Sequence, residues 1–206
     1  MLIHPAYFGP IIQYVGIVNA KKLTFEIEDN FQKQTYRNRC FIYGPNGKQL
    51  LTVPIVHSKR DTKQKTQDVR IDNSVPWQKL HSRALYTSYR SSPFFEFYID
   101  DLLILFEKKY KFLMDLNLTI NSVLFDCMEY KRAIQESKTY ELKPAIKYDY
   151  RGLINAKSKE VYPLKKYIQV FDYKQGFIPN LSILDLLFNE GPNTLLYLED
   201  HKNLLF

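Results

Sequence analysis

The sequence predicts a single α/β domain over residues 1–206, with a mixed and largely antiparallel N-terminal sheet flanked by helices. Short segments that alternate apolar and polar residues, separated by turn signals, dominate the first 71 residues. Longer segments with helical spacing follow from residue 77 onward. The chain is 45% hydrophobic and 15% aromatic over 206 residues, which is enough apolar material for one core.

Several strands are expected, and two of them form a hairpin. The predicted strands are residues 23–27, 38–43, 49–56, 68–71, 132–136 and 167–171. The hairpin is expected at Pro45-Asn46-Gly47, because this strong turn signal separates two strand candidates. The polar segment 58–68 shows no periodicity, so we expect a mobile loop there.

The helices are expected mainly in the second half of the chain. They are predicted at residues 77–89, 93–109, 117–130, 182–188 and 192–198. Ser92 followed by Pro93 favours a helix start, and Ser182 favours another. Gly191 favours a helix end, so the C-terminal part is expected to contain two short helices.

The two cysteines and the lack of long apolar runs indicate the compartment. Cys40 and Cys127 are far apart in sequence, and no segment has the pattern of a signal peptide. No run approaches the roughly 20 apolar residues that span a bilayer. We therefore expect a cytoplasmic protein with free thiols and no membrane span.

Charge and motif spacing exclude several ligand classes. The net charge is +7, but the basic residues are scattered, so we expect no nucleic acid partner. His, Cys and acidic residues show no metal-ligand spacing, and the seven glycines form no phosphate-binding or dinucleotide motif. We expect no metal and no cofactor, and the oligomeric state stays open.

His81 is the first candidate for a catalytic residue. It lies four residues after Trp77, so both side chains occupy one face of the expected helix. An imidazole beside an aromatic ring suits a general base next to a sugar or nucleotide ring. A core histidine that bonds a backbone carbonyl explains the same pattern, so both interpretations stay open.

Arg39 is a candidate for a ligand contact. Strand alternation places it on the same face as Arg37, and guanidinium groups bind phosphate or carboxylate. The structural alternative is an ion pair of either arginine with Asp29. A nucleophilic Cys40 with His81 as its base is a weaker alternative, because a small buried strand residue needs no chemistry.

Asn180, Ser182 and Asp185 form a polar group at the start of an expected helix. Ser182 with an acidic residue three positions later resembles a capping box, which satisfies free backbone amides. The functional alternative is that this helix N-terminus binds an anion such as phosphate or carboxylate. The sequence leaves both interpretations open for Asn180.

Eight segments carry a resemblance to a known family. They are residues 4–10 (HPAYFGP), 29–32 (DNFQ), 36–39 (YRNR), 51–54 (LTVP), 77–81 (WQKLH), 89–94 (YRSSPF), 167–171 (YIQVF) and 176–185 (GFIPNLSILD). Together they resemble the WbqC-like family of bacterial proteins over nearly the whole chain, and the last segment is the most specific. The resemblance implies a single WbqC-like domain over residues 1–206.

The resemblance also implies a function. Members of this family are associated with gene clusters for O-antigen and other surface polysaccharides. The chain is accordingly expected to be a transferase that attaches a small acyl or aminoacyl group to a sugar or nucleotide-sugar, with an activated acyl donor as the second ligand. The alternative is a non-catalytic binding module that recognises a nucleotide-sugar or a glycan-biosynthesis partner.

The implied site brings both ends of the chain together. The N-terminal segment, the Trp77 helix and the C-terminal block are expected to converge on a cleft, with His81 as general base. The family commonly has Gln where this chain has His4, so His4 is expected to bind ligand rather than transfer protons. The other expected ligand contacts are aromatic or polar side chains, namely Tyr7, Arg39, Trp77, Tyr89, Gln169, Asn180, Ser182 and Asp185.

Overall fold

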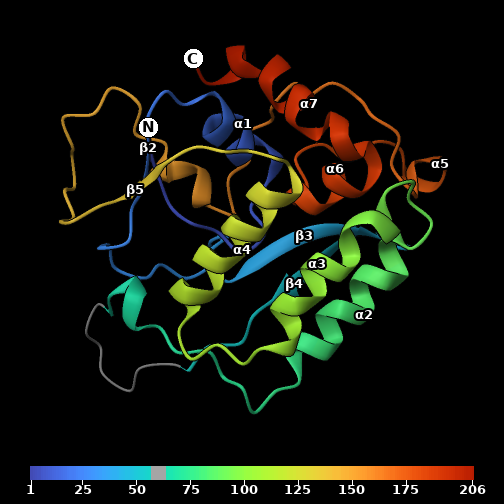
Figure 1. Ribbon diagram of the computed structural model, residues 1–206, viewed down its shortest axis with the longest axis horizontal. Helices are drawn as coiled ribbons and strands as arrows, with labels where there is room; N and C mark the ends of the chain where they lie inside the picture. The colour runs from blue at the N-terminus through green and yellow to red at the C-terminus, as the bar shows by residue number, and fades with distance from the viewer. Residues whose placement is uncertain (57–63) are drawn as a thin grey trace.

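The main sheet is parallel and contains three short strands. In the computed structural model, which describes residues 1–56 and 64–206, they are ordered β1 (Leu2–Ile3), β2 (Leu23–Phe25) and β5 (Ile134–Glu136) (Figure 1). The mixed α/β class is confirmed, but the prediction of a largely antiparallel sheet is wrong. Most of the loop expected at 58–68 lies outside the described residues.

The parallel arrangement follows from a helix that the sequence pattern did not reveal. Helix α1 (Ile11–Asn19) connects β1 to β2, and a helical crossover of this kind returns the chain in the same direction. All of its residues except Asn19 are buried. A helix that is buried on every side lacks the polar face on which the amphipathic signal depends, so its sequence shows no helical period.

The expected hairpin is confirmed and is separate from the main sheet. Strand β3 (Arg39–Gly44) pairs antiparallel with β4 (Gly47–Thr52). Gly47 has a φ of +100°, which glycine adopts without steric cost. A Cβ at Gly47 would also clash with the side chain of Gln175. The hairpin therefore depends on this glycine for its turn and for its contact with the C-terminal part.

Three long helices follow the hairpin. They are α2 (Trp77–Tyr89), α3 (Phe95–Glu107) and α4 (Leu113–Cys127). The bounds of α2 match the prediction. Helix α3 begins later than predicted, because the Ser92 hydroxyl donates to the Tyr89 carbonyl at 2.7 Å instead of capping α3. Helix α4 begins earlier than expected, where the Leu113 amide donates to the Val69 carbonyl at 2.9 Å.

The C-terminal part adds the short helices α5 (Asp172–Gln175), α6 (Ile183–Glu190) and α7 (Thr194–Asp200). Of these, α6 and α7 pack against α1. Single 3-10 turns occur elsewhere along the chain, at η1 (Thr66–Asp68), η2 (Arg151–Ile154), η3 (Gly191–Asn193) and η4 (Lys202–Leu204). Met1 and Leu205 both lie against Gly16. The two ends of the chain therefore meet over α1, as Figure 1 shows.

Two predicted strands are absent from the sheets. Residues 167–171 pair with no strand and end in a turn. The Gln169 side chain instead bonds both the amide and the carbonyl of Ile178, at 2.8 and 2.9 Å. Residues 68–71 form only isolated bridges, including Ile55 with Ile71. Side-chain and single backbone contacts replace ladder hydrogen bonds in both segments.

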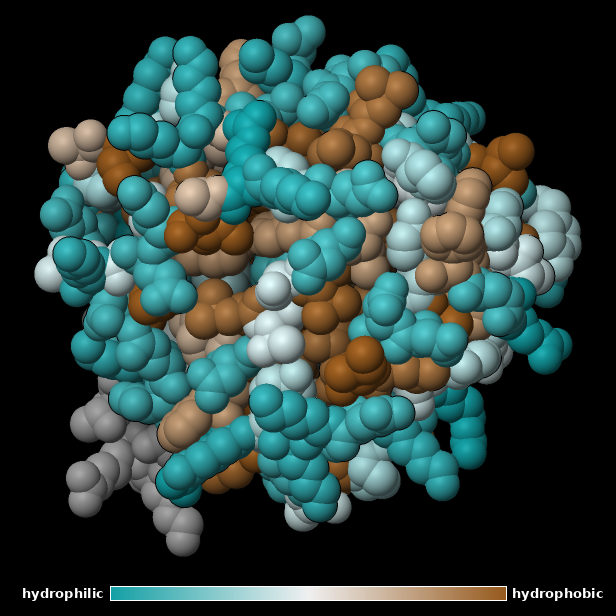
Figure 2. Space-filling model, viewed as in Figure 1, coloured by the Kyte–Doolittle hydropathy of each residue, from teal (hydrophilic) through white to brown (hydrophobic). Residues whose placement is uncertain are grey.

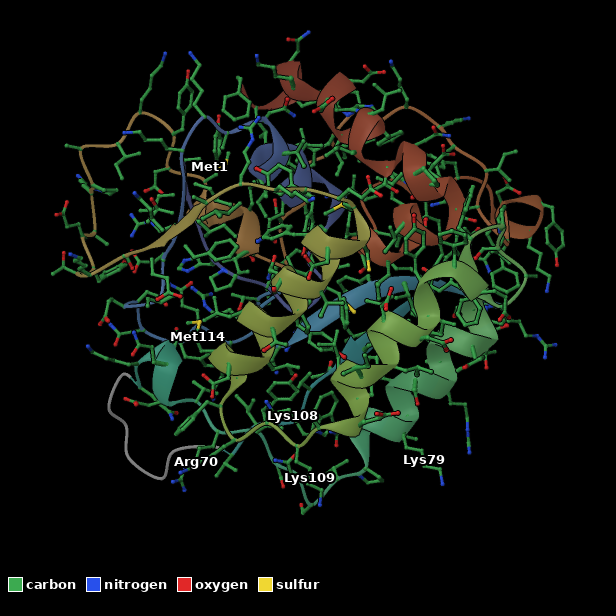
Figure 3. The ribbon with its side chains drawn as sticks, viewed as in Figure 1. Met1, Arg70, Lys79, Lys108, Lys109 and Met114 are labelled. Carbon is green, nitrogen blue, oxygen red and sulfur yellow. The ribbon has the colours of Figure 1, made fainter. Side chains whose placement is uncertain are left out.

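Basic side chains that are scattered in sequence gather at one edge. Figure 3 shows Arg70, Lys79, Lys108 and Lys109 along the lower edge of the view. All four residues are exposed, so basic side chains reach the surface along this edge. The sequence showed only the adjacent pair Lys108 and Lys109.

Candidate functional site

The N-terminal segment and the C-terminal block meet, as expected, but mainly through the backbone. The Ser182 hydroxyl donates to the Phe8 carbonyl at 2.8 Å, and the Ile183 amide donates to the Gly9 carbonyl at 2.9 Å. The Ile11 amide donates to the Leu181 carbonyl at 2.9 Å. These bonds dock α6 against the start of α1, and they place Ser182 in a structural role.

Asn180 caps helix α1 from a distant part of the sequence. Its Oδ1 accepts the Ile12 amide at 2.9 Å, although α1 has no side-chain cap of its own at Pro10. Asn180 has a φ of +53°, a conformation that asparagine tolerates better than most residues. The side chain is thus engaged with the helix rather than with an open surface.

Replacing Asn180 tests this cap. We expect Asn180→Ala to lower the free energy of unfolding by about 2 kcal/mol, of which about half is the lost cap and half the left-handed backbone. Asn180→Gly keeps that backbone free of strain, so it should cost only about 1 kcal/mol. Urea denaturation of both variants measures the difference. If both variants lost the same free energy of unfolding, the left-handed backbone of residue 180 would contribute nothing to the effect.

Asp185 is the centre of a fully buried polar cluster. Its carboxylate accepts hydrogen bonds from the Tyr89 hydroxyl at 2.9 Å, the Tyr167 hydroxyl at 2.5 Å and Gln169 Nε2 at 2.7 Å. Burial raises the pKa of Asp185 to about 6, although these three donors act in the opposite direction. The structure therefore brings three predicted site residues together, in the interior.

The capping box expected at α6 forms only in half. The Leu184 amide donates to the Ser182 hydroxyl oxygen at 3.3 Å, so Ser182 is the N-cap of α6, as predicted. The Asp185 carboxylate turns to the tyrosines instead of returning to Ser182. Helix α6 thus begins where expected, while its acidic residue holds the chain segments around it.

Tyr7 and His81 form a second buried pair. The Tyr7 hydroxyl and His81 Nδ1 are hydrogen-bonded at 2.7 Å, and the Trp77 ring lies edge-on to the imidazole with 5.4 Å between centroids. Burial lowers the pKa of His81 to about 4. Trp77 and Tyr7 are almost inaccessible, so these side chains pack as a core and present no open aromatic face.

Cys40 lies in the same interior. It is fully buried, and burial raises the pKa of its thiol. A thiol kept protonated is a poor nucleophile, so the surroundings of Cys40 favour the packing role that the sequence left as its alternative.

A polar cavity lies between β1 and the segment around η2, and we call it the His4–Arg151 cavity. Its volume is about 440 Å³, within the range of small-molecule sites. It is lined by His4, by residues between 29 and 35, and by residues between 140 and 155. Of the predicted site residues, only His4 lines it.

One wall of this cavity contains buried side chains that are linked by hydrogen bonds to Arg37. Arg37 donates to the Asp29 carboxylate and also lies 2.9 Å from His4 Nε2. Because a guanidinium only donates, Nε2 accepts, and the proton of a neutral His4 is on Nδ1, facing the Glu26 carbonyl at 3.4 Å. Burial, and then the charge of Arg37, lower the pKa of His4 well below its usual value.

A second charged wall of the cavity is held by Arg151. Its guanidinium donates to both carboxylate oxygens of Asp149, at 2.9 and 2.7 Å, and lies 3.5 Å from a Glu26 oxygen. It also lies over the Tyr140 ring, 5.3 Å from the centroid. The hydrogen bonds from Arg151 lower the pKa of Asp149, so the carboxylate stays ionised at neutral pH.

A second cavity lies beside the first, and we call it the Arg39 cavity. It has a volume of about 360 Å³ and is lined by residues between 31 and 39 and by residues 52–55. Lys33 lines both cavities. The predicted ligand contact Arg39 is therefore placed at a cavity, although not at the one that contains His4.

Sequence reasoning missed most of the His4–Arg151 cavity. Arg37 was placed on the same strand face as Arg39, with an ion pair to Asp29 as the structural alternative, and the structure shows that ion pair. Asp149 and Arg151 lie in a segment without periodicity, so no pattern singled them out. Their alternating spacing of opposite charges was the one available signal, and it is weak because such pairs are common on surfaces.

Neither a metal cluster nor a membrane helix is found in the described part of the chain. Across residues 1–56 and 64–206, no group of three His, Cys, Asp or Glu side chains is placed to hold a metal ion. Within the same ranges, no helix has the length and apolar character needed to cross a bilayer. Polar side chains cover much of the face shown in Figure 2.

The fold and the cavity define an α/β protein with a polar site large enough for a small molecule. The chain belongs to the WbqC-like protein family, whose model matches residues 5–150. It is also similar to Rv1507c of Mycobacterium tuberculosis, an uncharacterized protein, with 31% identity over 202 residues that cover 84% of this chain and 87% of that one. No solved structure matches the chain significantly.

Proposed function

We propose that this protein binds a sugar or nucleotide-sugar in the His4–Arg151 cavity and serves surface polysaccharide assembly. The observation that carries the proposal is the pair of charged walls that line a cavity of about 440 Å³. Sugar hydroxyls both donate and accept hydrogen bonds, so they suit a cavity that offers carboxylates and guanidinium groups together. Lys33 adds a positive charge that suits the phosphates of a nucleotide-sugar.

The walls are rigid enough to orient such a ligand. Asp29 is held by Arg37 and by the Thr66 hydroxyl at 2.6 Å, and Asp149 is held by Arg151. Side chains fixed by neighbouring hydrogen bonds lose little entropy when a ligand arrives. The arrangement therefore favours selective binding.

Recognition without catalysis is the activity that the geometry supports best. Asp29, Asp149 and Arg151 are each already bonded to a neighbour, and both ring nitrogens of His4 face protein atoms. A general base needs a free position within reach of the substrate proton. This supports a binding module that presents a sugar or nucleotide-sugar to glycan biosynthesis.

An acyl or aminoacyl transferase is the second candidate, favoured by the two cavities that share Lys33. A transferase needs adjacent places for donor and acceptor, and the two cavities provide such places. In this case His81 is the proposed general base or, since it lines neither cavity, a residue that positions its neighbours. Loss of turnover in His81→Ala with ligand binding retained would support its role, and unchanged turnover would exclude it.

Gly152 allows the binding site to be tested with matched variants. It lines the His4–Arg151 cavity, and a Cβ added there meets no atom within 4 Å. We expect Gly152→Ala to bind UDP-glucose or UDP-N-acetylglucosamine as the wild type does. Gly152→Trp should weaken binding about tenfold or more, because its side chain occupies space beside the walls. Isothermal titration measures both affinities, with the free sugars as further ligands.

The same ligands separate binding from transfer. Incubation of each nucleotide-sugar with acetyl-CoA, followed by mass spectrometry, would show an acylated product if the protein is a transferase. Binding without product supports the binding module. Equal affinity of the wild type and Gly152→Trp, or no binding of any of these sugars at millimolar concentration, would contradict the proposed site.

A further inference from the structure

The Arg39 cavity differs from its neighbour in charge. Lys33 and Arg39 are the charged residues that line it, and no acidic residue is among its lining residues. The His4–Arg151 cavity instead contains both Asp29 and Asp149. The two neighbouring cavities therefore suit different ligands, and the smaller one suits an anion.

Arg39 has no anionic partner among residues 1–56 and 64–206. Among the described residues its guanidinium makes no ion pair, and its Nε is buried without a hydrogen-bond partner. Arg37, two residues earlier, is paired with Asp29. An arginine that is partly desolvated and unpaired is unfavourable unless an anion neutralises it, so Arg39 is the residue in this segment that is left for a ligand.

The position of Arg39 is fixed by the hairpin. Arg39 is the first residue of β3 and pairs with Thr52 at the end of β4. The next contact is double, because the Val53 amide donates to the Asn38 carbonyl at 2.8 Å and Asn38 Nδ2 donates to the Val53 carbonyl at 3.0 Å. Strand register thus fixes the position of Arg39 relative to residues 52 and 53 of the cavity lining.

Much of the remaining lining of the cavity is apolar. Val53, Pro54 and Ile55 contribute to it, and Phe31 adds an aromatic ring. A fully hydrated inorganic ion would leave this surface unused, whereas an organic anion covers it and gains from burial. The composition of the lining therefore selects a small organic molecule with one anionic group.

We propose that the Arg39 cavity binds a small organic anion, a carboxylate or a phosphate ester with an apolar part, as a second ligand beside the sugar. Arg39 binds the anionic group, Lys33 adds charge at the border of the two cavities, and residues 53–55 contact the apolar part. Binding of the anion itself stands on this cavity alone. Only its description as a second ligand rests on the proposed function.

The test uses phenyl phosphate, butyrate and inorganic phosphate as probes of the whole chain, followed by isothermal titration and by amide chemical shifts. Phenyl phosphate or butyrate should bind more tightly than inorganic phosphate and should shift the amides of residues 38, 39 and 52. Arg39→Gln should weaken that binding about tenfold or more, since it removes a charge-assisted contact. Arg39→Lys, which keeps the charge, should recover part of it.

Arg83→Gln is the matched control, because Arg83 is an exposed arginine on α2. It should leave anion binding unchanged. If Arg39→Gln fails to fold by circular dichroism, Lys33→Gln takes its place in the anion titration alone, since Lys33 is exposed and also lines the His4–Arg151 cavity. Equal affinity of the wild type and the folded variant, or shifts confined to other parts of the chain, would overturn the anion site.

Sugar binding in the same variants separates this proposal from the proposed function. Arg39→Gln should bind a nucleotide-sugar as the wild type does, while Gly152→Trp should keep its affinity for phenyl phosphate. Loss of anion binding alone supports the Arg39 cavity as a separate site. If the wild type binds the sugar but no anion, the anion site is overturned. If it binds the anion but no sugar, only the sugar site is overturned.

Discussion

Replacing Arg37 with methionine is expected to lower the free energy of unfolding by about 3–5 kcal/mol. Arg37 is almost fully buried, and its guanidinium is the ionic partner of the buried Asp29 carboxylate. Removing the cation leaves that carboxylate with the Thr66 hydroxyl as its remaining side-chain donor. The large effect arises because the buried Asp29 carboxylate has lost its hydration and, without Arg37, has no counter-charge to compensate for that loss.

An exposed ion pair provides the control for this experiment. Lys65 pairs with Glu28 at 2.9 Å, but 56% of the Lys65 side chain is exposed. Lys65→Met should therefore cost less than about 1 kcal/mol. Urea denaturation at neutral pH measures both variants, and a similar small cost for the two would show that Arg37 and Asp29 contribute no more than a surface pair.

A double variant distinguishes the charge from the packing. Asp29→Asn combined with Arg37→Met removes both charges, so it should be less destabilised than the sum of the two single variants. Additive losses would mean that the two side chains act independently. Because the same pair forms one wall of the His4–Arg151 cavity, the experiment also measures the interaction free energy that holds this wall together.

Elements that depend on local signals were predictable from the sequence. The hairpin follows from the turn at Pro45-Asn46-Gly47, and α2 follows from its spacing of apolar residues. Helix α1 was not predicted, because burial on every side removes the helical period from its sequence. Without this helix between β1 and β2, the parallel direction of the main sheet was not predicted either. One undetected helix thus changed the topology assigned to the first strands.

The candidate site was predictable only in its parts. The sequence identified His4 and Arg39 as residues that bind ligand, but it assigned them to one cleft, whereas the structure places them at two cavities. The segment that holds Asp149 and Arg151 has only a weak local signal, because its position depends on bonds such as that from the Tyr150 amide to the Leu2 carbonyl. Contacts between distant segments decide such sites, and periodicity carries no information about them.

Asp185 provides the second large effect, which appears as a pH dependence of stability. The pKa of Asp185 in the folded protein is about 6, above the usual 3.8, so the folded state binds this proton more tightly than the unfolded chain does. The resulting stabilisation is complete below the usual pKa and is lost as the pH rises through about 6. Its size is about 3 kcal/mol, from the free energy of a pKa difference of this order.

His81 opposes this effect in the wild type. Its pKa in the folded protein is about 4, below the usual 6.5, so its stabilisation is complete above the usual pKa and is lost as the pH falls through about 4. Over the acidic range the two contributions have opposite slopes. A single pH profile of the wild type therefore conceals both, and a variant is needed to separate them.

Asp185→Asn removes one of the two contributions. Asparagine does not ionise, so the variant should gain about 3 kcal/mol relative to the wild type between about pH 4 and pH 7, whatever its absolute stability. Urea denaturation across this range gives both profiles. Asp200→Asn, at an exposed residue, should instead run nearly parallel to the wild type. A parallel profile for Asp185→Asn would mean that the carboxylate surrounded by Tyr89, Tyr167 and Gln169 is ionised as readily in the folded protein as in the unfolded chain.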